Sequence, residues 1–115
     1  METQIVSNTV RPGQEWIDTQ SNMIYLVVGF CKSSADESDQ YTEVMYRSHD
    51  MPPGCYLYKP ITDWFTTQSN GYPAFLPYYL LSQERHCLIR SLAFDRDDEF
   101  KMIKQILLQI FKGIG

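Results

Sequence analysis

The sequence contains few cysteines and no long apolar run. Its three cysteines, Cys31, Cys55 and Cys87, form no C-x-x-C pair, whereas disulfide frameworks and structural zinc sites use more numerous or more closely spaced ligands. We therefore expect three buried thiols, no metal and no cofactor. The longest apolar run, residues 23–31, is about half the length of a membrane-spanning helix of roughly 20 residues. This argues against a membrane protein.

Motifs that bind phosphate or carry nucleophilic catalysis are also missing. The six glycines are scattered, and neither G-x-x-x-x-G-K-S/T nor G-x-G-x-x-G occurs. The two histidines lie beside charged residues, His49 next to Asp50 and His86 next to Arg85, but no Gly-x-Ser-x-Gly elbow accompanies them. A general base needs a partner group and a pocket, so we expect a protein that is not an enzyme. A small hydrolase using His49 or His86 is the least favoured alternative.

Positive charge is in the minority. Ten Lys and Arg residues stand against fourteen Asp and Glu residues, which gives a formal net charge of −4 and a pI near 5.0. Surfaces that bind long nucleic acids normally carry surplus Lys and Arg, so we expect no such partner. Residues 1–10 have neither the basic nor the apolar region of a secretory signal, and this predicts a cytoplasmic protein of a bacterial or an infected host cell.

Aromatic residues, in contrast, are plentiful, at 14% of the 115 residues. That supply of apolar area fits a single folded domain over residues 1–115. Within it, residues 1–10 are expected to be a flexible arm or an edge strand. The small, acidic stretch 33–39 is expected to be a hairpin loop.

Alternation and turn residues predict an antiparallel sheet. The apolar run 23–31 is expected to be its central strand, buried on both faces. Residues 72–81 are expected to be irregular or at an edge, because Pro73 and Pro77 cannot donate hydrogen bonds to a neighbouring strand. The expected strands are 15–18, 23–31, 41–48, 55–59 and 86–94.

The clearest helix is at the C-terminal end of the sequence. Acids at 95–99 suit the positive end of a helix dipole, and apolar residues from Phe100 to Ile114 recur at helical spacing, which predicts a helix over 95–114. A shorter helix is expected over 63–67, capped by Thr62. The predicted fold class is α+β, a small antiparallel sheet of five to six strands closed by a C-terminal amphipathic helix.

Some apolar residues of the C-terminal helix lie off its main stripe. Met102 and Leu108 would make the helix apolar on more than one side, and such a surface suits a homodimer. The alternative is that the stripe packs only on its own sheet. The expected oligomer interface residues are Met102, Ile106, Leu108 and Phe111.

Several short segments resemble a family of small bacterial and phage domains of unknown function. The segments are Trp16, Tyr25-Leu-Val-Val-Gly29, Thr42-Glu-Val-Met-Tyr-Arg47, Leu57-Tyr-Lys-Pro-Ile61 and Asp63-Trp-Phe65, within about residues 13–77. Lys59 stands where the family has Arg, and Met45 where it has Val. The resemblance implies an SH3-like, partly open barrel and a bacterial or phage setting. It implies no catalytic residues.

A cluster of aromatic and basic residues is the candidate ligand site. Aromatic faces can stack a base while Arg and Lys bind phosphate oxygens. The alternative is that Tyr46, Tyr58 and Trp64 belong to the core, with Arg47 and Lys59 facing solvent. The expected ligand-binding residues are Tyr46, Arg47, Tyr56, Tyr58, Lys59 and Trp64, with Arg90 joining from the strand expected at 86–94.

Together these patterns favour a non-enzymatic cytosolic binding module, encoded by a phage or a bacterium. Two kinds of target stay open. One is a host protein that the module blocks, as an anti-defence protein would. The other is a small nucleotide, sequestered in a dimer cleft by Arg47, Lys59 and stacked aromatics.

Overall fold

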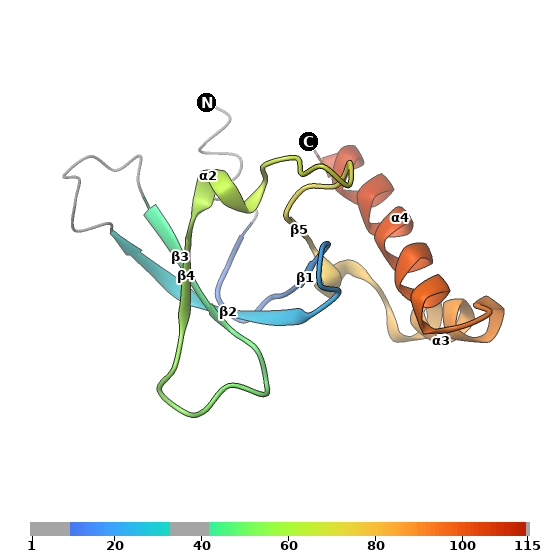
Figure 1. The fold of residues 1–115 in the computed structure, drawn as a ribbon, viewed down its shortest axis with the longest axis horizontal. Coiled ribbons are helices and arrows are strands. Elements are labelled where there is room, and N and C mark those ends of the chain that lie inside the picture. The colour runs from blue at the N-terminus through green and yellow to red at the C-terminus, as the bar shows by residue number, and fades with distance from the viewer. Residues whose placement is uncertain (1–9, 33–41, 115) are drawn as a thin grey trace.

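The computed structural model describes residues 10–32 and 42–114. Its strands form an open antiparallel sheet in the order β4-β3-β2-β1-β5, with helices packed at one end (Figure 1). This confirms the predicted α+β class, with two long helices where the sequence predicted one. The elements are β1 (Glu15–Asp18), β2 (Ile24–Lys32), β3 (Thr42–Arg47), β4 (Leu57–Pro60), α2 (Ile61–Trp64), β5 (Phe75–Leu76), a 3-10 turn η1 (Tyr78–Leu80), α3 (Gln83–Leu92) and α4 (Arg96–Ile114).

Two turns position the first strands. Gly13, with φ of +90°, precedes β1, and Asn22, with φ of 64°, precedes β2. Both are backbone conformations in which Gly and Asn are favoured. Residues 1–9 of the expected arm, and the expected hairpin loop at 33–39, lie outside the described residues.

The strand pair β1–β5 separates two apolar cores. Trp16 of β1 and Phe75 of β5 face the first core, whereas their neighbours Ile17 and Leu76 face the second. This follows from strand geometry, because successive side chains point to opposite faces of a sheet. The first core is aromatic: the Trp64 and Phe75 rings are stacked with centroids 3.8 Å apart.

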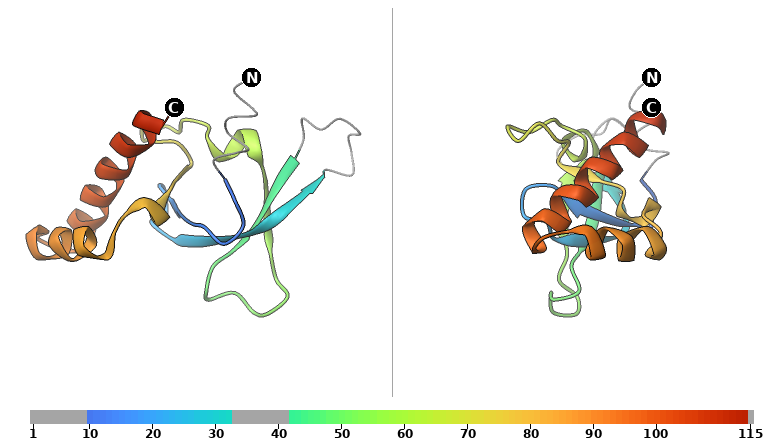
Figure 2. Two further views of the ribbon diagram at one scale, coloured as in Figure 1. Left: turned by 180° about the vertical axis from the view of Figure 1, so that it is seen from behind. Right: turned by 90° about the vertical axis from the view of Figure 1, so that its right-hand side faces the viewer.

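The second core joins the sheet to α3 and α4. Figures 1 and 2 show both helices beside β1 and β5, at the end of the sheet away from the β3–β4 hairpin. Ile89 of α3 and Ile103 and Leu107 of α4 supply its buried side chains. The predicted C-terminal helix is therefore confirmed, and it packs on its own sheet.

Thr19, at the end of β1, connects three segments. Its side chain is buried, and its hydroxyl donates a hydrogen bond to the Pro73 carbonyl at 2.6 Å. Its own carbonyl accepts a hydrogen bond from Lys104 Nζ at 3.1 Å. β1, the segment before β5 and α4 are thus held together by polar contacts as well as by apolar packing.

The expected burial of the strand at 23–31 is wrong, although its central position is correct. Val27 is 1% exposed, but Phe30 and Met23 are each 38% exposed. The helices cover β1 and β5 and leave the outer face of β2 uncovered (Figure 2). The strands buried on both faces are therefore β1 and β5.

The strand expected at 86–94 is also wrong, because residues 83–92 form α3. Ser82 is its N-cap and accepts a hydrogen bond from the Arg85 backbone N–H at 3.1 Å. Leu88 and Leu92, four residues apart, lie on one helix face rather than on one strand face.

Two further local predictions need correction. The short helix begins at Ile61, with Pro60 as its N-cap and no side-chain cap, so Thr62 lies in its first turn. Pro60 has φ of −55° and ψ of 141°, so it is still extended and the helix begins at the residue after it. Of the cysteines expected to be buried, Cys31 is partly buried, whereas Cys55 and Cys87 are exposed. Within the described residues, no helix combines the length and apolar character needed to cross a bilayer.

Candidate functional site

The predicted aromatic and basic cluster is divided by the sheet. Tyr46 and Trp64 are 6% and 0% exposed and belong to the first core. Lys59 lies on the same face, with Nζ 5.9 Å from the centroid of the Phe75 ring. Cross-strand pairs share a face, and Met45 pairs with Tyr58 while Val44 pairs with Lys59. Tyr58 therefore lies on the face opposite Lys59.

What remains on the surface is a smaller group at the β3–β4 hairpin. Tyr56 and Tyr58 are 37% and 52% exposed, and we call them the hairpin surface. Leu57, between them, is 39% exposed but pairs with Tyr46 and so lies on the other face of the sheet. Arg47 lies beside the hairpin surface, with its guanidinium carbon 5.9 Å from the Tyr56 ring and its terminal nitrogen donating to the Met51 carbonyl at 2.7 Å. The structure thus brings Arg47 and Tyr56 together, and separates them from Trp64.

Arg90 lies elsewhere, in a cleft that the sequence did not predict. The cleft has a volume of about 660 Å³ and lies between β1, η1 and α3. It brings both histidines of the chain to one site, and we call it the histidine cleft. Its polar or reactive lining includes Glu15, His49, Tyr79, His86, Cys87 and Arg90.

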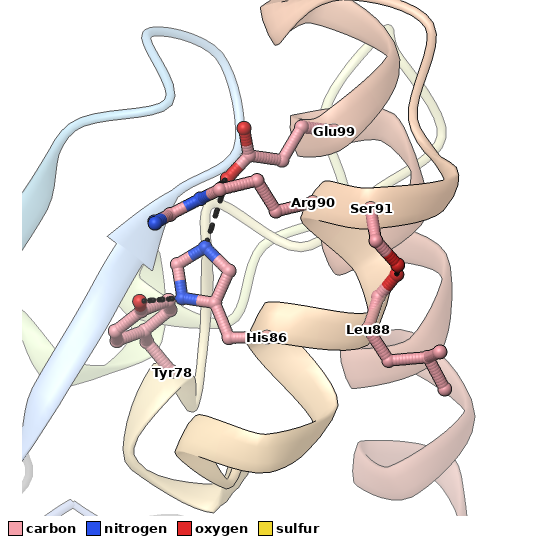
Figure 3. Close-up of polar contacts among 6 residues, drawn as sticks. All are labelled: Tyr78, His86, Leu88, Arg90, Ser91 and Glu99. Atoms are coloured by element: carbon pink, nitrogen blue, oxygen red, sulfur yellow. Dashed lines mark hydrogen bonds and ion pairs between the residues drawn. The ribbon is translucent and has the colours of Figure 1, made fainter.

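A chain of hydrogen bonds fixes His86 in the wall of this cleft (Figure 3). Its Nε2 lies 2.9 Å from Glu99 Oε2, and its Nδ1 lies 2.8 Å from the Tyr78 hydroxyl. A carboxylate can only accept, so Nε2 carries the proton, and in the neutral ring Nδ1 accepts from the tyrosine. The three residues come from α4, α3 and η1, so the chain also ties these elements together.

The charges around Glu99 stabilise its ionised form. The hydrogen bond from His86 lowers the pKa of the Glu99 carboxyl below its usual 4.5, against the opposing effect of burial, and Arg90 adds to the lowering. Arg90 Nε lies 3.6 Å from the same carboxylate oxygen. Glu99 is therefore a fixed negative charge behind the cleft, balanced by Arg90.

Most polar groups in the wall of the cleft already have hydrogen-bond partners. Both ring nitrogens of His86 are engaged, and burial raises the pKa of the Tyr78 hydroxyl, which stays protonated at neutral pH. His49 is 76% exposed, with Nε2 3.4 Å from Glu15 Oε2. In the part of the chain that the structure describes, no three His, Cys, Asp or Glu side chains are placed to hold a metal ion.

The side chains of the oligomer interface expected on α4 are largely packed inside the protein. Met102, Ile106, Leu108 and Phe111 are partly buried and packed against the second core. Phe111 stacks on Phe65, with ring centroids 5.5 Å apart. The large apolar side chains left most exposed are on α3 and directly after it: Leu88, Leu92 and Phe94.

One sequence signal could have found the histidine cleft. Ser82 followed by Glu84 is an N-cap with an acid in the first turn, and a helix from there places His86 and Arg90 one turn apart on one face. No signal in the sequence pairs His86 with Glu99, because that contact depends on how α4 folds back on α3.

Comparison with known proteins adds no identity: no family model, no curated protein and no solved structure matches the chain. The resemblance to small SH3-like bacterial and phage domains therefore stays an expectation that rests on the short motifs alone.

Proposed function

We propose that the protein is a non-enzymatic binding module that holds a small anionic ligand, such as a nucleotide, in the histidine cleft. The observation that supports this most is the fixed, fully hydrogen-bonded His86 in a cleft that also contains an accessible Arg90. Because His86 is already fixed beside a cationic side chain, little conformational entropy of the protein is lost when a ligand binds.

Arg90 is the residue expected to bind the anion. Its side chain is 67% exposed and contacts Glu99 through Nε. In Figure 3 the side chain extends from α3 alongside His86, so its terminal nitrogens are presented beyond the ion pair. A guanidinium can bind a carboxylate or phosphate through two parallel hydrogen bonds.

Tyr79 supports a ligand that contains a ring. It lines the same cleft, is 39% exposed, and its ring contacts Trp16 at a centroid distance of 5.9 Å. An exposed aromatic ring that is supported by a buried neighbour can stack a base. A guanidinium and an aromatic face in one cleft fit a nucleotide. A cytosolic, phage- or bacterium-encoded protein that sequesters a nucleotide signal would need these two features.

The test is a thermal-shift screen of the protein with linear and cyclic nucleotides and with inorganic phosphate. A ligand that binds the native state raises Tm by mass action. We expect a shift with at least one nucleotide, and we expect Arg90→Ala to abolish it while Lys101→Ala, an exposed cation of α4, leaves it intact. No shift with any of these anions would overturn the proposal.

A second candidate function is the binding of a host protein at the hairpin surface. The observation in its favour is that Tyr58 is exposed on β4, an edge strand of the open sheet, and that Tyr56 is exposed directly before it. The expected occupant is an extended segment that adds to β4 as a further strand, because such an edge offers unpaired backbone groups. Photo-crosslinking from position 56 would capture that partner, and Tyr58→Lys would abolish the capture.

A further inference from the structure

We propose that the outer face of α3 is the interface with a second copy of this chain, and that the two copies of α3 pack antiparallel about a two-fold axis. Leu88, Leu92 and Phe94 are 58%, 65% and 95% exposed. Leu88 and Leu92 lie one helical turn apart on one face, and Ile89, on another face, is buried in the second core. The apolar face of α3 is thus separate from the face that packs on the protein.

Phe94 projects from a fixed backbone. Its N–H donates a hydrogen bond to Asp98 Oδ2 at 2.9 Å, in the first turn of α4. The side chain itself is almost fully in contact with solvent. A large apolar side chain that is exposed on the surface of a small protein marks a site that another molecule covers.

Charges at the two ends of this face identify the second copy as the occupant. Glu84 and Arg85 lie before Leu88, and Asp95 and Arg96 lie after Leu92, all exposed. With a two-fold axis midway between the two leucines, Leu88 of one copy meets Leu92 of the other. The same symmetry brings Glu84, at the start of one α3, toward the end of the other copy's α3, where Asp95 leads into α4 and Arg96 begins it. A face whose two ends carry matching opposite charges complements itself.

The shape of the face is self-complementary in the same register. A hollow of about 270 Å³ lies beside Leu88, lined by Ser82, Glu84, Arg85 and Leu88. The two-fold arrangement places Phe94 of the other copy next to this hollow. One antiparallel arrangement therefore covers both leucines, gives Phe94 a socket and pairs the end charges.

This interface leaves the histidine cleft open. In Figure 3, Leu88 points away from His86 and Arg90, which face the cleft from the other side of α3. The proposal is therefore independent of the proposed ligand, and each can fail without the other. It also differs from the interface expected on α4, whose apolar residues pack against the second core.

The first test is the mass of the full chain in solution, measured by sedimentation velocity over a range of protein concentrations. We expect a concentration-dependent species of twice the 13.5 kDa monomer mass. Leu92→Glu should give a monomer, with an unchanged far-ultraviolet circular dichroism spectrum because Leu92 is exposed. Gln105→Glu, at an exposed position of α4 between Met102 and Leu108, is the matched control and should leave the dimer in place. A wild-type protein that is monomeric at every concentration would overturn the proposal.

The second test uses the symmetry of the charge pair. Glu84→Arg alone places two positive charges opposite each other, and Arg96→Glu alone places two negative charges there, so each should weaken the dimer several-fold. The double variant in one chain restores opposite charges across the interface and should recover the wild-type dissociation constant. A double variant that dimerises no better than the single variants would exclude this register, and loss of the dimer in Gln105→Glu alone would assign it to α4.

Discussion

His86 Nε2 lies 2.9 Å from Glu99 Oε2, a contact between α3 and α4 that closes behind the histidine cleft. His86 and Glu99 side chains are 21% and 16% exposed, so water screens the pair only in part. The hydrogen bond lowers the pKa of Glu99. A carboxyl with a lowered pKa in the folded state stabilises that state when it is ionised.

This contact predicts a loss of stability in acid. The contribution of Glu99 is complete above its usual pKa of 4.5 and is lost as the pH falls through its lower pKa in the folded protein. Glu99→Gln should reduce the free energy of unfolding at neutral pH by about 1–2 kcal/mol and flatten its decline between about pH 5 and pH 3. Urea unfolding across that range measures both effects. Asp97→Asn, which changes an exposed acid in the same turn of α4, should retain the wild-type slope.

Tyr46 predicts a corresponding change at high pH. Burial, with smaller contributions from Tyr25 and Asp18, raises its pKa from 10.0 to about 12. A raised pKa means that the neutral form stabilises the fold, and that this contribution is lost as the pH rises from the usual value through about 12. In an alkaline absorbance titration, Tyr46→Phe should remove a component that ionises near pH 12. A component near pH 12 that survives in Tyr46→Phe would contradict the assignment.

Thr19 provides a test of the polar contacts at the end of β1. Thr19→Val keeps the shape of the side chain but removes the hydroxyl that donates to the Pro73 carbonyl at 2.6 Å. A buried carbonyl left without its donor costs about 1–3 kcal/mol of unfolding free energy. Thr62→Val, at an exposed site in α2, should cost far less. Equal losses in the two variants would show that the Thr19 hydrogen bond contributes little.

Truncation of two residues of the predicted ligand cluster should change the free energy of unfolding by very different amounts. Trp64 is fully buried and stacked on Phe75, so Trp64→Ala should lower the free energy of unfolding by about 3–5 kcal/mol. Tyr58 is 52% exposed, and Tyr58→Ala should change it by only about 0.5 kcal/mol. Chemical denaturation of both variants is the measurement. A Trp64→Ala protein of wild-type stability would return Trp64 to the list of ligand-binding candidates.

The sequence predicted the sheet well where turns and alternation agree. The central place of the apolar run 23–31 and the edge position of the proline-rich segment 72–81 follow from local chemistry alone. It failed at α3, because Leu88, Leu92 and Phe94 fit a strand pattern as well as a helix pattern over so short a stretch. The strand expected at 86–94 therefore also misplaced Arg90 with the aromatic cluster of β3 and β4.

The candidate site was harder to predict than the fold. Tyr78, His86 and Glu99 come from three elements, and only the packing of α4 on α3 brings them together. The aromatic cluster, conversely, is close in sequence but is split by the alternation of strand side chains. Contacts between distant elements and the choice of face are tertiary properties, and a single sequence shows them only indirectly.

The β1–β5 strand pair makes the two cores depend on each other. Trp16 and Phe75 support one core, and Ile17 and Leu76, their immediate neighbours, support the other. If either core unfolds, one face of the same two short strands is exposed to water. Neither core is therefore expected to stay folded without the other. The described fold should therefore unfold cooperatively as one unit. Tryptophan fluorescence, which reports the first core, and helical circular dichroism, which reports α3 and α4, should follow a single transition.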